Sequence, residues 1–447
     1  MPYMADDAFP RSLEGIKSFG SMIAFLKMYF YTLGQKLIVH AVYLIVLKYR
    51  LLFLLIGPLT VALTAYTINF LINSKNVKPI SWGICLLFFI FPFWDLQTSG
   101  YVLDTVIYFL PFCAMLISFI PLKNIIEGNP YSKNIWQTII FVLALIYACN
   151  VEQILVMIFP VLVFFLIFYE GRGKTFIWLQ FMICCLSALY TVLTPGLYVR
   201  MSGETYIWFR DFASLSIFKL LELGFSSTAY HYIFKPNSIF LLFYILLALV
   251  VWRQKNLAAQ ISIIFIAITI LAFGYIFDIA RNSMTVYGYI APYYFSSYNY
   301  LFLFLLIIVC IALGYLIYRA FYGSRQKLLT AFAILFLGIL SRGLLMFSPT
   351  IWGSQTRTFF FLNFALLFLC IMLFQVLQNY KFNKKAFYIF VIALAFINTF
   401  LFIIHILNIL QEGIFIFSKL KVFIDSYLMP RYDLVGWEMA VQSIQKG

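Results

Sequence analysis

The sequence predicts an all-α fold: a polytopic membrane bundle of about twelve transmembrane helices, with amphipathic interfacial helices in its outer loops. Three observations predict it: 64% of the 447 residues are hydrophobic, only 11% are charged, and long apolar runs recur along the chain. These runs approach the roughly 20 residues that a helix needs to cross about 30 Å of hydrocarbon. They are continuous rather than alternating with polar residues, which favours helices over a barrel.

The expected spans divide the chain into three parts. We predict spans at 51–72, 80–94, 101–121, 135–149, 154–168, 175–194, 238–252, 257–277, 299–318, 328–347, 358–377 and 386–405. Residues 1–50 then form an outer loop with interfacial helices, 51–405 the transmembrane bundle with a long outer loop at 195–237, and 406–447 an outer tail.

Charge distinguishes the two faces of the predicted bundle. Alternate connections are rich in lysine and arginine but hold only two acidic residues, Glu127 and Glu170. By the positive-inside rule these connections are cytoplasmic, so the other polar loops and both chain ends face outward. The net charge of +15 is thereby explained by topology. We therefore expect a multi-pass cell-membrane protein with membrane lipid as a partner and no nucleic acid.

Cysteine and histidine give no sign of a metal site or a disulfide framework. All seven cysteines lie within or at the ends of apolar runs, where a thiol behaves as a small hydrophobe. The three histidines are far apart in the sequence and lack partners at metal-ligand spacing.

The outer face carries the candidate chemistry. Asp6 and Asp7 stand beside a chain that is otherwise almost all membrane span, and ionisable residues in that position are functional candidates. The candidate substrate-binding residues are Glu152, Gln153, Arg200, Glu204, Arg210, Arg281, Arg342 and Arg357. Arginine binds phosphate through a planar fork, and a carboxylate can take a proton from an attacking hydroxyl. A single arginine can instead snorkel to lipid headgroups, which is the alternative for each.

Several of these residues belong to short motifs. The stretch Pro2–Asp7 resembles the first-outer-loop motif of the GT-C superfamily of integral membrane glycosyltransferases. Asn150–Gln153, Pro195–Arg200 and Met346–Pro349 followed by Arg357 resemble its bacterial branch, which decorates O-antigen or cell-wall polysaccharides of the cell envelope.

The resemblance implies a hexosyltransferase with an outward-facing site, a polyprenyl-phosphate sugar donor and a glycan or glycolipid acceptor. It implies that Asp6 or Asp7 is the catalytic base, that Arg200 and Arg357 contact the donor phosphate, and that Glu152 and Gln153 contact substrate. Some members of the superfamily need a divalent cation and others need none, so no cofactor is assigned.

Two alternatives stay open: a polymerase of lipid-linked polysaccharide repeat units, and a transporter or flippase of lipid-linked glycans. The chain also departs from the superfamily pattern, in which a transmembrane helix precedes the acidic pair. Only five residues precede Asp6. We therefore expect the native gene to encode a further apolar span upstream of Met1.

Overall fold

The structure is a computed structural model that describes most of the chain and is almost entirely helical. The residues it describes are 18–72, 88–93, 101–128, 135–171, 173–208, 210–234, 236–272, 285–286, 289–290, 297–351, 356–378, 389, 391–396 and 399–400. Their one sheet is a hairpin of two short antiparallel strands, β1 (Thr285–Val286) and β2 (Tyr289–Ile290). The predicted all-α class is confirmed.

Along the chain the helices fall into three consecutive stretches. The first contains α2 (Phe19–Thr32), α3 (Leu37–Lys48), α4 (Arg50–Ile72), α6 (Tyr101–Asp104), the π-helix η3 (Thr105–Phe109), α7 (Leu110–Ser118) and α8 (Ile120–Ile126). The second is α9 (Ile135–Cys149), α10 (Glu152–Phe168), α11 (Lys174–Leu193), α12 (Pro195–Trp208), η4 (Phe212–Ser214), α13 (Ile217–Ala229) and η5 (Tyr230–Phe234). The third is α14 (Ser238–Trp252), α15 (Leu257–Leu271), α17 (Ser297–Phe321), α18 (Arg325–Gly343), η7 (Leu344–Phe347), η8 (Thr356–Phe359) and α19 (Phe360–Gln378).

Six helical segments among the described residues are long and apolar enough to cross a membrane: Leu51–Ile72, Val102–Ile126, Lys174–Leu193, Leu303–Phe321, Arg325–Phe347 and Thr356–Leu377. Each coincides with a predicted span. A seventh is possible if the pair Ile217–Ile233 and Ser238–Trp252, bent by 77°, forms one broken span. A multi-pass membrane protein is consistent with this set.

The predicted count of twelve is not confirmed. α9, α10 and α15 are apolar but have only 15 to 17 residues. At 1.5 Å per residue such helices reach about 23–26 Å, short of the hydrocarbon thickness of about 30 Å. The expected spans at 80–94 and 386–405 lie mostly outside the described residues, as do Asp6, Asp7, Arg281 and the tail at 406–447.

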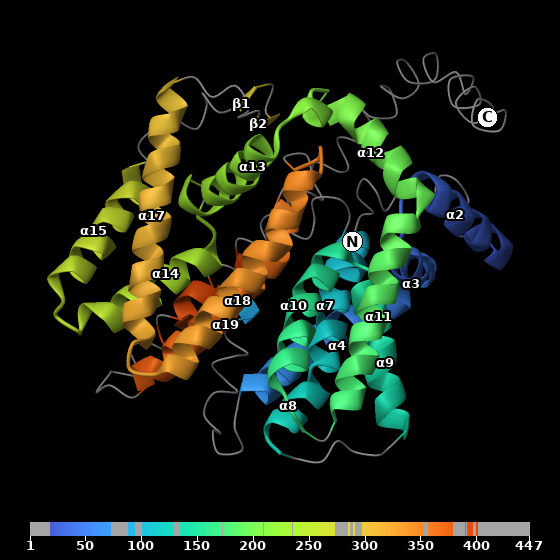
Figure 1. Ribbon diagram of the computed structural model, residues 1–447, viewed down its shortest axis with the longest axis horizontal. Coiled ribbons are helices and arrows are strands. Elements are labelled where there is room, and N and C mark those ends of the chain that lie inside the picture. The colour runs from blue at the N-terminus through green and yellow to red at the C-terminus, as the bar shows by residue number, and fades with distance from the viewer. Residues whose placement is uncertain are drawn as a thin grey trace.

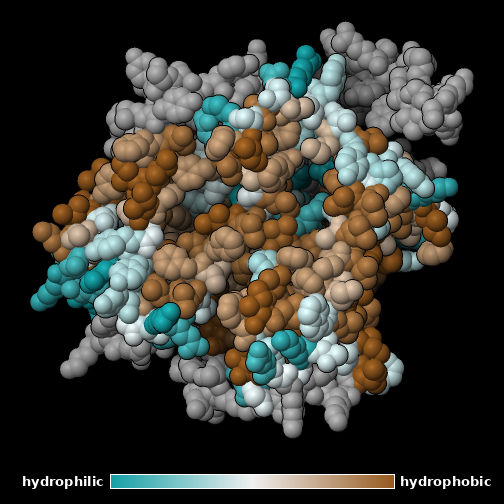
Figure 2. All heavy atoms as spheres, in the orientation of Figure 1, coloured by the Kyte–Doolittle hydropathy of each residue, from teal (hydrophilic) through white to brown (hydrophobic). Residues whose placement is uncertain are grey.

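The helices form two neighbouring groups joined through α10, α18 and α19. Figure 1 shows α9, α10 and α11 side by side in one group and α14, α15 and α17 in the other, with α18 and α19 between them. Packed phenylalanine rings connect α7 to α19; the Phe112 and Phe364 ring centroids, for example, are 4.2 Å apart. On the face in Figure 2, apolar side chains form a broad belt across the middle, and hydrophilic ones gather toward its rims. That distribution suits a bilayer-embedded chain.

Further helices lie in the predicted outer loops. α2 and α3 lie within the loop at 1–50, and α12 and α13 lie within the loop at 195–237. α2 begins at a capping box between Ser18 and Ser21 and ends before Gly34, whose φ of +146° allows the turn into α3. α12 then packs across α2, near the end of that helix.

Candidate functional site

A polar cavity of about 450 Å³ lies where α2, α3, α6, η3, α12 and η8 meet. Five charged side chains line it: Lys36, Asp104, Arg200, Glu204 and Arg357. They come from four segments that are far apart in the sequence. A cavity of this size with few, convergent polar groups is the usual form of a small-ligand site.

Part of the wall is apolar or aromatic. Phe25, Leu33, Leu103 and Ile107 supply the apolar part. Tyr29, His40, Tyr43 and Tyr108 add rings that carry a polar atom. The polar cavity therefore offers both charge and a hydrocarbon surface, as an amphiphile with an anionic headgroup would require.

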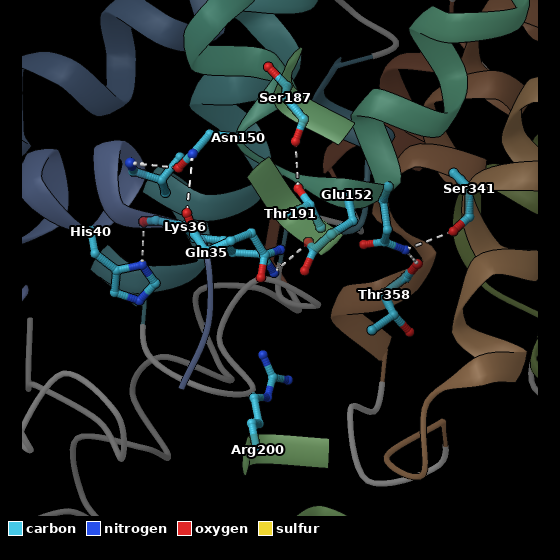
Figure 3. Close-up of polar contacts among 12 residues, drawn as sticks. Gln35, Lys36, His40, Asn150, Glu152, Ser187, Thr191, Arg200, Ser341 and Thr358 are labelled. Atoms are coloured by element: carbon cyan, nitrogen blue, oxygen red, sulfur yellow. Dashed lines mark hydrogen bonds and ion pairs between the residues drawn. The ribbon is translucent and has the colours of Figure 1, made fainter. Parts of the chain in front are cut away.

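Three cations of the site are paired with carboxylates. Lys36 Nζ lies 3.0 Å from Glu152 Oε2, and Arg200 Nε lies 2.6 Å from Glu204 Oε1 one helical turn along α12. Figure 3 shows Arg200 pointing toward Gln35, Lys36 and Glu152.

The third pair is longer and joins the two halves of the chain. Arg357 Nη1 lies 3.9 Å from Asp104 Oδ1, and the Asp104 side chain is only 1% exposed. A π-helical turn, η3, directly follows Asp104. Such turns change the direction in which a helix presents its side chains and recur at functional sites.

The turn between α9 and α10 holds Lys36 in place. Asn150 Oδ1 accepts a hydrogen bond from Val39 N at 3.2 Å, and its Nδ2 donates to Gln35 O at 3.3 Å. The backbone amides in the first turn of α3 have no partner within that helix, and Asn150, from the turn between α9 and α10, accepts a hydrogen bond from one of them. Together with the ion pair of Glu152, this fixes the α2–α3 connection on which Lys36 stands (Figure 3).

Burial alters the titration of groups near Lys36. Burial, with smaller contributions from the cations Lys36 and Arg200, lowers the pKa of His40 to about 3. Its Nδ1 donates to the Lys36 carbonyl at 2.9 Å. That hydrogen bond favours the charged ring, but burial outweighs it, so the ring is neutral at physiological pH. Burial likewise raises the pKa of Tyr29, which keeps the phenol protonated. For Arg200 burial is the largest influence and works against the charge, but Glu204, Tyr29 and Glu152 together outweigh it, and the pKa is raised.

The structure separates the predicted site residues into three sets. Arg200, Glu204 and Arg357 line the polar cavity, and Glu152 pairs with a lining residue. Gln153, Arg210 and Arg342 are not among its lining residues. Arg210 is exposed, with its guanidinium 5.1 Å from the Tyr206 ring centroid. Arg281 lies with Asp6 and Asp7 outside the described residues.

Neither Asp104 nor Lys36 is among the site residues that the sequence predicted. A signal for Asp104 was present, because it is the single carboxylate in the apolar run 101–121 and stands at the predicted outer end of that span. Lys36 had no comparable signal, since its carboxylate partner Glu152 is distant in the sequence.

Among the described residues, no group of three or more histidine, cysteine, aspartate or glutamate side chains could hold a metal ion. No protein-family model matches the chain, and neither a curated protein nor a solved structure matches it at a significant level.

Proposed function

We propose that this protein is a GT-C-type glycosyltransferase, which moves a hexose from a polyprenyl-phosphate donor to a glycan or glycolipid acceptor at the outer face of a bacterial cell membrane. One observation carries the proposal. Arg200 and Arg357, the two arginines that the sequence motifs connect with a donor phosphate, line the same polar cavity although they are far apart in the chain. Lys36 and an apolar wall complete the surroundings that a lipid phosphate needs.

The chemistry assigns separate tasks to cations and carboxylates. An acceptor hydroxyl oxygen bonds to the anomeric carbon of the sugar while the bond from that carbon to the phosphate oxygen breaks. Polyprenyl phosphate leaves with the bonding electron pair, and guanidinium groups stabilise its added negative charge. A carboxylate takes the hydroxyl proton. Attack opposite the leaving group inverts the sugar configuration.

The carboxylates fit different roles in this scheme. Asp104 is buried and lies 3.9 Å from Arg357, within ion-pair distance. We assign Asp104 to orienting Arg357, and we keep Asp6 or Asp7 as the base that the sequence motif implies.

Transfer assays on the full chain in proteoliposomes test the proposal. Radiolabelled polyprenyl-phosphate glucose, galactose and mannose are supplied with a lipid extract that contains cell-surface glycolipids. We expect one sugar to form a new glycosidic bond. Replacing the base, by Asp6→Asn or Asp7→Asn, should lower kcat by about 10²- to 10⁴-fold. Asp104→Asn should mainly raise the KM for the donor.

Two results would contradict the proposal. One is unchanged transfer by both Asp6→Asn and Asp7→Asn. The other is movement of the labelled lipid across the bilayer without any new glycosidic bond, which would favour a flippase.

A further inference from the structure

Arg357 reaches the polar cavity from the first turn of a helical segment. η8 (Thr356–Phe359) is a 3-10 turn that leads directly into α19, so α19 supports its C-terminal end. The amide groups of a first turn have no preceding helical turn to pair with, so the position of Arg357 also depends on contacts with other elements. Two buried side chains that do not line the cavity contact this turn.

The first of these side chains is Gln153, at the start of α10. It is 5% exposed, and its Nε2 donates to Ser341 O at 3.0 Å and to Thr358 O at 3.4 Å. Thr358 directly follows Arg357, and Ser341 lies near the end of α18. One amide therefore joins α10, α18 and η8; Figure 3 labels Ser341 and Thr358, the residues whose carbonyls accept its hydrogen bonds.

The second is Arg342, which is 2% exposed. Its guanidinium carbon lies 4.4 Å from the centroid of the Phe359 ring, a cation–π distance. Its Nη2 donates to Ile351 O at 3.3 Å and to Ser227 Oγ at 2.9 Å. Arg342 thus contacts the chain both before and after Arg357, and through Ser227 it connects these contacts to α13.

We propose that Gln153 and Arg342 are positioning residues for Arg357. They hold the backbone of η8 so that the guanidinium of Arg357 is presented to the phosphate of the substrate, and they do not contact substrate themselves. This inference rests on the proposed function, because it takes the ligand of the polar cavity to be a lipid phosphate. It replaces the role of substrate contact that the sequence suggested for these two residues.

The test measures the Kd of farnesyl phosphate for the full chain purified in detergent. Gln153→Glu removes the amide donor at almost unchanged size, and Phe359→Leu removes the ring under Arg342 without changing a charge. Each is made alone and together with Arg357→Ala. Gln180→Glu is the matched control, because Gln180 is also buried and its Nε2 donates to a backbone carbonyl, Ser118 O, at 2.8 Å. Neither Gln180 nor Ser118 lines the polar cavity.

Non-additivity is the readout that a purely structural role would not produce. Arg357→Ala should weaken binding about 10- to 100-fold, as expected for a charged hydrogen bond. Gln153→Glu and Phe359→Leu should each weaken binding about 5- to 10-fold in the normal background, and neither should have an effect once Arg357 is absent. Gln180→Glu should leave the Kd unchanged.

Three results would overturn the inference. The losses from Gln153→Glu and Arg357→Ala could multiply in the double variant, which would mean an independent contact. Gln153→Glu could leave the Kd unchanged, or Gln180→Glu could weaken binding equally. If the unaltered protein does not bind farnesyl phosphate at all, the proposed function fails, and the positioning role falls with it.

Discussion

The two sides of the polar cavity hold their cations in different ways. On the N-terminal side, Lys36 and Arg200 each lie within 3.0 Å of a carboxylate, and Arg200 and Glu204 stand one turn apart on the same helix. On the C-terminal side, Arg357 stands in the 3-10 turn that opens the helix continued by α19, and it lies 3.9 Å from Asp104. The turn itself is held through its backbone by Gln153 and through a ring by Arg342. A cation inside a helix can be held by its neighbours on that helix, whereas a cation in the first turn also depends on residues of other elements that fix that turn.

The largest effect is expected from a change at Gly196, where α12 packs closely against the end of α2 on the N-terminal side of the polar cavity. A Cβ added to Gly196 would lie 2.4 Å from Phe30 O and 2.8 Å from Gly34 N. Both are backbone atoms, so Gly196→Ala must push α12 away from α2 and move Arg200. We expect a loss of about 1–3 kcal/mol in stability and strongly reduced transfer.

Gly203→Ala is the control for this change, because it lies in the same helix and an added Cβ there meets nothing within 4 Å. Thermal unfolding in detergent compares the two variants. Equal unfolding midpoints for Gly196→Ala and Gly203→Ala would show that the close approach of α12 to α2 is unimportant.

A smaller effect should distinguish the two arginines. Lysine keeps the charge but lacks the planar fork, so Arg357→Lys should raise the KM for the donor by about tenfold. Arg200→Lys should have a smaller effect, because Arg200 shares its guanidinium with Glu204 at 2.6 Å. Steady-state transfer kinetics measure both. Unchanged kinetics in Arg357→Lys would instead favour an arginine that merely snorkels to lipid headgroups.

A separate effect on stability concerns pH and His40. The pKa of this residue is about 3 in the folded protein and 6.5 when unperturbed. Between about pH 3 and pH 6.5 the imidazole is therefore protonated in the unfolded chain but neutral in the folded protein. The stability that the neutral ring contributes is therefore complete above about pH 6.5 and is lost as the pH falls toward 3. At pH 5 the loss should be about 2 kcal/mol. His40→Phe removes the titrating group. The unfolding midpoint of this variant should therefore fall less than that of the unaltered protein when the pH is lowered from about 7.5 to about 5. Parallel declines in the two proteins would contradict this assignment.

Much of the helical architecture could be predicted from hydrophobic runs alone. The runs predicted at 135–149 and 238–252 coincide with α9 (Ile135–Cys149) and α14 (Ser238–Trp252). Polar turns such as Asn150–Gln153 mark helix ends clearly because they interrupt otherwise apolar sequence. What the runs could not decide is which helices cross a bilayer, since α9, α10 and α15 are apolar enough but short.

The site was less accessible to sequence reasoning. The sequence analysis selected Arg200, Glu204 and Arg357, which do line one cavity, but it grouped Gln153 and Arg342 with them as substrate contacts. Whether a polar side chain near a helix end faces a cavity or a neighbouring backbone depends on how the helices are rotated and packed. That information is tertiary, so the contacts of Gln153 with Ser341 and Thr358 could not be predicted from spacing.

The central claim is that the polar cavity binds the phosphate of a polyprenyl phosphate. An experimental structure of the full chain with farnesyl phosphate tests it most directly. We predict that the phosphate group lies within hydrogen-bonding distance of the Arg357 guanidinium and beside Arg200, with the hydrocarbon chain along Phe25 and Leu33. A phosphate bound elsewhere, with neither Arg200 nor Arg357 in contact with it, would contradict the account.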